Sequence, residues 1–146
     1  MPRTEAGIAA LFTRYAAFVA KALDGEADIE AAASFYAGAF IAATPAGIVA
    51  GENDDRWRQA LAGGFERYRD IGTKAMTVRT LRVSAIDDCH SIAHVGWSAV
   101  YARAGQADVT IDFDVHYLVQ TLDGEPKIFG WISGDEQDVL RRHGIL

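Results

Sequence analysis

The stretch Val109–Gln120, with the sequence VTIDFDVHYLVQ, gives the clearest indication of how this chain folds. Apolar side chains occupy its odd-numbered positions, and polar or charged ones occupy nearly all of its even-numbered positions. Successive side chains of a β-strand point to opposite faces, so the alternation predicts a long strand with one apolar and one polar face. The polar face carries Asp112, Asp114 and His116, with neighbours about 6.6 Å apart along the strand.

The second half of the chain keeps this period of two and predicts three more strands. We place them at Met76–Ile86, Ser91–Arg103 and Lys127–Ser133, with the central strand extending over Asp108–Leu122. The segments Ala104–Ala107 and Asp123–Gly124 contain residues that favour tight turns between strands. The order predicts an antiparallel meander.

The first half of the chain has helical periodicity instead. We expect helices from Thr4 to Asp24, from Asp28 to Thr44, and from Asn53 or Asp54 to Gly72, with a loop at Ala46–Gly51 that includes a short strand at Ile48–Val49. Gly63–Gly64 lies inside the third helix, which indicates either a close backbone contact or a local break. A terminal helix at Asp135–His143 begins with Asp135 as its cap. Helices followed by a meander indicate the α+β class.

Length, charge and composition limit the possible roles. A chain of 146 residues is expected to form a single domain over residues 1–146. The net charge of -6 disfavours nucleic-acid binding, and no Lys/Arg run suggests a membrane-surface patch. Cys89 is the only cysteine, and no nucleotide-binding motif is present, so we expect no cofactor and no metal site. Without a signal-like or membrane-spanning apolar run, we expect a cytoplasmic protein that does not bind membranes.

Four segments carry a resemblance that covers nearly the whole chain: Phe35–Phe40, Trp57–Tyr68, Trp97–Tyr117 and Ile128–Ile132. In this order the chain resembles the nuclear-transport-factor-2-like superfamily, which includes ketosteroid isomerases, polyketide cyclases and dehydratases. The resemblance implies a cone-shaped α+β cup, with N-terminal helices packed in a curved antiparallel sheet. It also implies an internal cavity and a homodimer formed through the sheet. It does not select a function, and no catalytic residue is carried over from it.

The polar strand face predicts an acid–base set. A carboxylate in a partly apolar cup has a raised pKa and can exchange protons near neutral pH. We expect Asp112 to be a general base and His116 its proton partner, with His94 on the preceding strand as a second candidate. The alternative is that this face meets solvent or a partner subunit, as many half-exposed strands do.

The hairpin register decides which residues join this set. If the turn is centred on Gly105-Gln106, paired residue numbers sum to 211, so that Trp97 opposes Asp114, and Tyr101 flanks the same polar face. A slip of one residue places His94 beside His116 instead. The sequence leaves both registers open.

Aromatic residues complete the predicted site. The expected ligand-binding residues are Tyr36, Phe40, Trp57, Phe65, Trp97, Tyr101, Asp114 and Trp131. The hypothesis is that the cup binds a small hydrophobic or cyclic molecule and converts it by cofactor-independent isomerisation, dehydration or cyclisation. The alternative is a non-catalytic dimerisation or scaffold module whose cup is filled by side chains.

Overall fold

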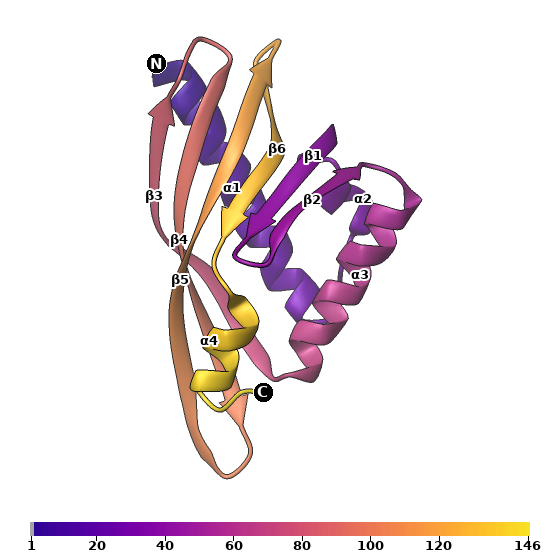
Figure 1. Ribbon diagram of the computed structural model, residues 1–146, viewed down its shortest axis with the longest axis vertical. Coiled ribbons are helices and arrows are strands. Elements are labelled where there is room, and N and C mark those ends of the chain that lie inside the picture. Colours follow the sequence, from indigo (N-terminus) through magenta and orange to yellow (C-terminus); the bar gives the residue numbers. More distant parts are fainter. Residues whose placement is uncertain (1) are drawn as a thin grey trace.

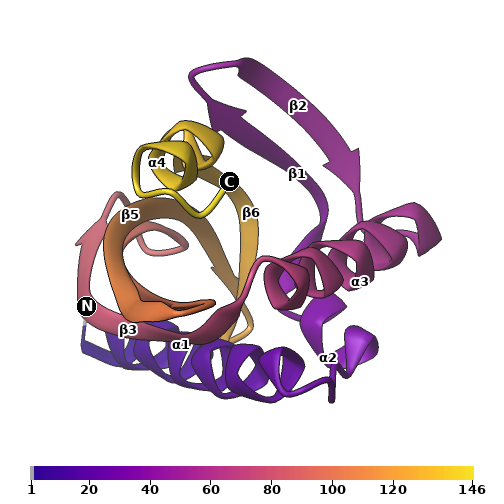
Figure 2. The same cartoon turned by 90° about the horizontal axis from the view of Figure 1, so that it is seen from below.

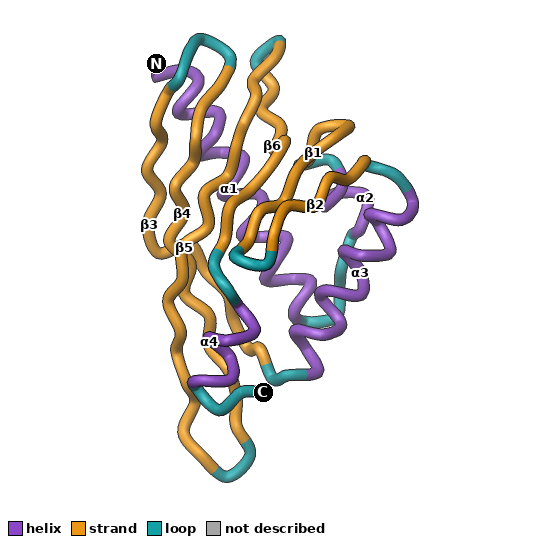
Figure 3. Tube along the Cα trace, viewed as in Figure 1, coloured by secondary structure: helices purple, strands orange, loops and turns teal. Residues whose placement is uncertain are grey.

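A computed structural model describes residues 2–146, with side chains from Thr4 onwards (Figure 1). The elements in chain order are α1 (Pro2–Leu23), α2 (Ile29–Ala33), β1 (Tyr36–Thr44), β2 (Gly47–Glu52), α3 (Asp55–Asp70), β3 (Thr73–Ala85), β4 (His90–Arg103), β5 (Gln106–Leu122), β6 (Glu125–Ser133) and α4 (Glu136–Arg142). The first half is mainly helical and the second half mainly strand (Figure 3). Strands β1 and β2 of the first half belong to the same sheet as the strands of the second half.

The six strands form one curved sheet in the order β2-β1-β6-β5-β4-β3. Seen along its length, the sheet curls, with α1 along one side, α3 beside it and α4 at the open end (Figure 2). The predicted α+β cup is confirmed. One detail differs from the predicted antiparallel sheet, because β1 pairs with β6 in parallel. This pair attaches the β1–β2 hairpin to the end of the meander.

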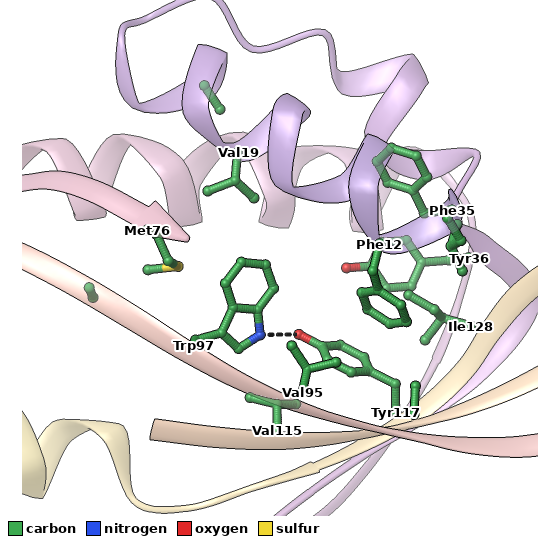
Figure 4. Packing of buried hydrophobic residues seen from close by; sticks show 14 of the residues in the cluster. Phe12, Val19, Phe35, Tyr36, Met76, Val95, Trp97, Val115, Tyr117 and Ile128 are labelled. Carbon is green, nitrogen blue, oxygen red and sulfur yellow. Dashed lines mark hydrogen bonds between the residues drawn. The ribbon is translucent and has the colours of Figure 1, made fainter. Parts of the chain in front are cut away.

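Helix α1 supplies much of the core. Its residues Ile8, Leu11 and Phe12 are at most 1% exposed, and they recur at the spacing of one helix face. By length and composition alone, Thr4–Leu23 could cross a membrane. A core helix also passes that test, and here the apolar face packs over sheet residues such as Trp97 and Tyr117 (Figure 4).

The pairing of β4 with β5 fixes the two faces of the sheet. His94 lies opposite His116, and Trp97 lies opposite Phe113, so paired numbers sum to 210. The register with a sum of 211 is therefore wrong, and the slip of one residue is what the structure shows. Arg103 pairs with Gln106 around a two-residue turn, and the register shifts by one at Ala102. The odd-numbered residues of β4 and β5 form what we call the inner face, and the even-numbered residues form the outer face.

The predicted second helix is wrong beyond its first turn. Helix α2 ends at Ala33, and the following residues form β1, which pairs with β2 and β6. Tyr36 and Phe40 are buried four residues apart, a spacing that fits a helix face and a strand face equally well. Gly38 lies between them and has no side chain to reveal the alternation. The predicted loop at 46–51 is likewise mostly strand β2.

Helix α3 matches its prediction closely. Asp54 caps it by accepting a hydrogen bond from the backbone N–H of Trp57 at 3.0 Å. The helix is continuous through Gly63 and Gly64, and a Cβ at either position would meet nothing within 4 Å. Neither a local break nor a close backbone contact explains the glycine pair.

We predict that Gly72→Ala destabilises the fold more than Gly105→Ala. Both glycines have positive φ, which an alanine adopts only with strain. At Gly72 the added Cβ would also lie 2.7 Å from the backbone oxygen of Ala102, whereas at Gly105 it would meet nothing. Denaturant unfolding should show a loss of about 1–3 kcal/mol for Gly72→Ala and a smaller loss for the matched variant. Equal losses would show that the contact with Ala102 is unimportant.

Candidate functional site

The inner face of the sheet, together with α3 and α4, encloses a cavity of about 390 Å³. Residues of α1 and β1 close its inner end, and the segment from Ser133 to Leu140 borders its mouth. Its walls are mainly apolar side chains and aromatic rings. A cavity of this size lies within the usual range for small-molecule sites.

All eight tyrosines and tryptophans of the chain line this cavity: Tyr15, Tyr36, Tyr68, Tyr101, Tyr117, Trp57, Trp97 and Trp131. Of the seven phenylalanines, only Phe65 and Phe113 do so. Tyrosine and tryptophan differ from phenylalanine in carrying a hydrogen-bonding group on the ring. The cavity therefore collects the rings that offer both apolar surface and a polar atom.

Three of these tyrosines and one tryptophan form two hydrogen-bonded pairs at the inner end, which we call the hydroxyl network. The indole N–H of Trp97 donates to the hydroxyl of Tyr117 at 3.1 Å (Figure 4). The hydroxyl oxygens of Tyr15 and Tyr36 lie 2.9 Å apart, so one of these hydroxyls donates to the other. The indole can only donate, and each hydroxyl carries one proton. Each pair therefore leaves one hydroxyl proton without an acceptor inside the network.

Burial keeps these tyrosines in their neutral form. Desolvation raises the pKa of Tyr15, and it raises the pKa values of Tyr36 and Tyr117 well above the usual value. Burial, and then the negative charge of Glu136, raises the pKa of Tyr101 to about 12. The same two causes raise the pKa of Tyr68 well above its usual value. At neutral pH all five tyrosines are hydrogen-bond donors.

The mouth of the cavity carries a carboxylate held by a tyrosine. The hydroxyl of Tyr68 on α3 donates to Oε1 of Glu136 on α4 at 2.9 Å. Asp135 also borders the mouth, but its Oδ1 accepts from the backbone N–H of Asp138 at 3.0 Å and so caps α4. The Tyr68–Glu136 hydrogen bond links α3 to α4.

The predicted acid–base residues lie on the outer face. His94 and His116 are cross-strand neighbours whose Nδ1 atoms are 2.8 Å apart, a distance at which one proton can be shared between two rings. The Asp112 and Asp114 side chains are 53% and 67% exposed, and their carboxylates lie 3.5 and 3.6 Å from the guanidinium of Arg79. Among the described residues, no three His, Cys, Asp or Glu side chains come together to hold a metal ion.

A sequence model of the family described as NTF2-like protein (DUF6841) matches residues 4–136. The chain belongs to this NTF2-like family. A search of curated proteins finds no match. Family membership agrees with the curved sheet and its enclosed cavity, which the structure shows independently.

Solved structures of low sequence identity share the NTF2-like fold. An NTF2-like protein with a cystatin-like fold from Novosphingobium aromaticivorans has a TM-score of 0.68 and 12% identity, covering 97% of this chain and 88% of that one. An uncharacterised protein from Caulobacter vibrioides has a TM-score of 0.65 and 12% identity, covering 97% and 96%. A ketosteroid isomerase-like protein from Erwinia carotovora atroseptica has a TM-score of 0.62 and 13% identity, covering 88% and 93%. At these identities the likeness shows the fold alone.

The structure separates the two groups of residues expected to form one NTF2-like site. Of the predicted ligand-binding residues, those that line the cavity are Tyr36, Trp57, Phe65, Trp97, Tyr101, Asp114 and Trp131. Phe40 lies behind the wall, with its ring 4.6 Å from that of Trp57. Asp112, His116 and His94 are on the other side of the sheet. His94 lies on the opposite face of β4 from Trp97 in any register, and the observed register puts Asp112 and His116 on the face of His94. Asp114 borders the cavity, but its carboxylate is the one directed to Arg79.

Four residues of the NTF2-like cavity that carry a polar group, Tyr15, Tyr68, Tyr117 and Glu136, were not among the predicted site residues. Tyr15, Tyr68 and Tyr117 belong to the apolar stripes of α1, α3 and β5. Their common signal was that a hydroxyl-bearing ring recurs on the buried face of several elements. Glu136 gave no signal beyond its place in the first turn of the terminal helix.

We predict that the tyrosines resist ionisation until the fold opens. The pKa values of these tyrosines are raised in the folded state, so just above pH 10 only the unfolded chain ionises. The free energy of unfolding is therefore unaffected by the tyrosines below about pH 10 and falls as the pH rises above that value. Tyrosinate absorbance and circular dichroism, followed together during an alkaline titration, should change together. Tyrosinate formation near pH 10 in a chain that keeps its native circular dichroism would contradict the buried network.

A second pH dependence comes from the outer-face histidine pair. Partial burial, Arg82 on β3 and His116 on β5 together lower the pKa of His94 below 6.5. Because the pKa of His94 is lower in the folded state, the unfolded chain takes up the proton more readily. The contribution of His94 to the free energy of unfolding is therefore fully present above about pH 6.5 and is lost as the pH falls through the folded-state pKa. We expect His94→Gln to lose less stability than the wild type on acidification from neutral pH.

The matched control for this prediction is His143→Gln, at the exposed end of α4. Urea unfolding at a series of pH values should give the control the same slope as the wild type. A slope unchanged in His94→Gln would show that this histidine has an ordinary pKa.

Proposed function

We propose that the cavity of this NTF2-like protein binds a small, largely apolar, cyclic molecule. The observation that carries the proposal is that all tyrosines and tryptophans of the chain line one cavity. Aromatic walls with a few polar atoms are typical of small-molecule sites, where ring faces supply contact area and polar atoms set orientation. A core filled only for stability would have no need to gather these two residue types.

The volume of the cavity favours binding over the rival hypothesis of a scaffold with a filled cup. A space of about 390 Å³ lies within the usual range for ligand sites, whereas a cup filled by side chains would leave no such space. Gly64 on α3 contributes to this space, because it borders the cavity and a Cβ there would meet nothing within 4 Å. A glycine inside a helix costs about 1 kcal/mol of stability relative to alanine. The open space at Gly64 is therefore kept at a cost to the stability of α3.

The hydroxyl network favours a ligand that carries an oxygen acceptor. Two hydroxyl protons among Tyr15, Tyr36 and Tyr117, one from each hydrogen-bonded pair, have no acceptor within the network. A carbonyl, hydroxyl or ether oxygen at the inner end of the cavity would accept one of them, and buried donors are costly to leave unpaired. The ring-shaped class of ligand also fits the description of the Erwinia carotovora atroseptica neighbour as ketosteroid isomerase-like.

Binding has more support here than conversion of the ligand. Asp112, His94 and His116 lie across the sheet from the cavity and cannot reach a molecule bound inside it. Within the described residues, the titratable groups that line the cavity are the tyrosine hydroxyls and the carboxylates of Asp114, Asp135 and Glu136, of which Asp114 is directed to Arg79. The raised pKa values of the tyrosines make them hydrogen-bond donors rather than bases at neutral pH.

We predict that Gly64→Leu weakens ligand binding and that Gly63→Leu does not. Both glycines lie in α3 with free space around them, but only Gly64 borders the cavity. Calorimetric titration with tryptophol, a neutral bicyclic alcohol, should show binding that is at least about tenfold weaker in Gly64→Leu, a change of about 1.4 kcal/mol. Unfolding curves should show that both variants are as stable as the wild type or more so. Equal affinities in the two variants would place the ligand elsewhere.

A further inference from the structure

We infer that the cavity selects ligands carrying a protonated amine, with the ammonium at the mouth beside Glu136 and the apolar body among the rings. This inference rests on the proposed function of the cavity and adds the charge of its ligand. It follows from which charged groups surround the space, how they are paired and what the walls offer to an ion.

The charged residues around the cavity are all acidic. Within the described residues, the lining includes Asp114, Asp135 and Glu136, and no Lys, Arg or His. Asp114 directs its carboxylate to Arg79 on the outer face, and Asp135 accepts a hydrogen bond from the backbone N–H of Asp138. Of the three carboxylates, Glu136 is the one hydrogen-bonded to another side chain of the cavity lining, Tyr68.

Glu136 is held at the mouth without a counter-charge. Its Oε1 accepts the hydroxyl proton of Tyr68, which fixes the side chain against α3. Of the side chains from residue 4 to the end of the chain, no cationic one forms an ion pair with it. A carboxylate keeps several acceptor positions, so one hydrogen bond from Tyr68 leaves room for an N–H donor.

The negative charge of Glu136 acts on two tyrosines that line the cavity. It adds to burial in raising the pKa values of Tyr68 and Tyr101, because it disfavours a second negative charge on their rings. The same field that disfavours a phenolate would favour a cation in the space between them. Tyr68 and Tyr101 come from α3 and β4, so the effect reaches both walls.

The aromatic walls add to the preference for a cation. The faces of Trp and Tyr rings carry partial negative charge and attract ammonium groups within about 6 Å of the ring centre. An anionic ligand would meet the opposite situation: it would lose its hydration in an apolar space that offers no positive side chain. The hydroxyls at the inner end can donate a hydrogen bond to a neutral oxygen, but they supply no net charge.

Three indole compounds with one ring system test the inference. Tryptamine carries an ammonium, tryptophol a neutral hydroxyl and indoleacetate a carboxylate at neutral pH. Calorimetric titration of the full chain should give tryptamine the highest affinity and indoleacetate an affinity lower by at least about tenfold. Glu136→Gln, which can still accept the hydrogen bond from Tyr68, should weaken tryptamine about tenfold while leaving tryptophol unchanged. Glu66→Gln is the matched control, since Glu66 is exposed on α3 and does not line the cavity.

The outcomes separate this inference from the proposed function. If tryptophol binds and Gly64→Leu weakens its binding, but indoleacetate binds as well as tryptamine, the cavity is a ligand site and the charge selection is wrong. An unchanged tryptamine affinity in Glu136→Gln would also overturn the assignment of the ammonium position. If none of the three compounds binds, the proposed function fails together with the inference.

Discussion

The register between β4 and β5 is the constraint on which the rest of the structure depends. Side chains in a strand alternate with a period of two, so a one-residue slip would turn every side chain of one of these strands to the opposite face of the sheet. With His94 opposite His116, the tryptophan and tyrosines of these strands face the helices, and the charged residues face outward. The register follows from a two-residue turn and a single shift at Ala102. A cavity lined by rings exists because this local geometry holds.

The cavity also shows unusual polar chemistry for an interior. Buried polar groups in proteins are nearly always hydrogen-bonded, because leaving one unpaired costs free energy. Here the hydroxyl network retains two unmatched protons, and the buried indole N–H of Trp57 has no partner among the described residues. Buried polar groups without a hydrogen-bond partner tend to occur at functional sites, where a ligand supplies the missing partner. Unpaired donors beside an open space are easier to explain by binding than by folding alone.

Much of the fold could be predicted from the sequence, and the site only in part. The strands of the meander, α3 and its cap at Asp54 have strong local signals, since periodicity and capping depend on neighbouring residues. Strand β1 was missed because Tyr36 and Phe40 are four apart with Gly38 between them, which is compatible with either structure. The acid–base set was misplaced because a register depends on the turn and on bulges, which sequence periodicity does not report. Glu136 meets Tyr68 only through tertiary packing across 68 residues.

In a cup built by wrapping a sheet around helices, a ligand inside can contact only the apolar face of each strand. Charged side chains such as Asp112 are stable on the outer face, where water solvates them, and would be costly on the inner one. The chemistry available inside must therefore come from residues that are mostly apolar and carry one polar atom, which in this chain are Tyr and Trp. Full charges are restricted to the rim, where Glu136 can stay partly hydrated while Tyr68 holds it in place. The same physical rule thus places rings inside, a carboxylate at the mouth and the histidine pair outside.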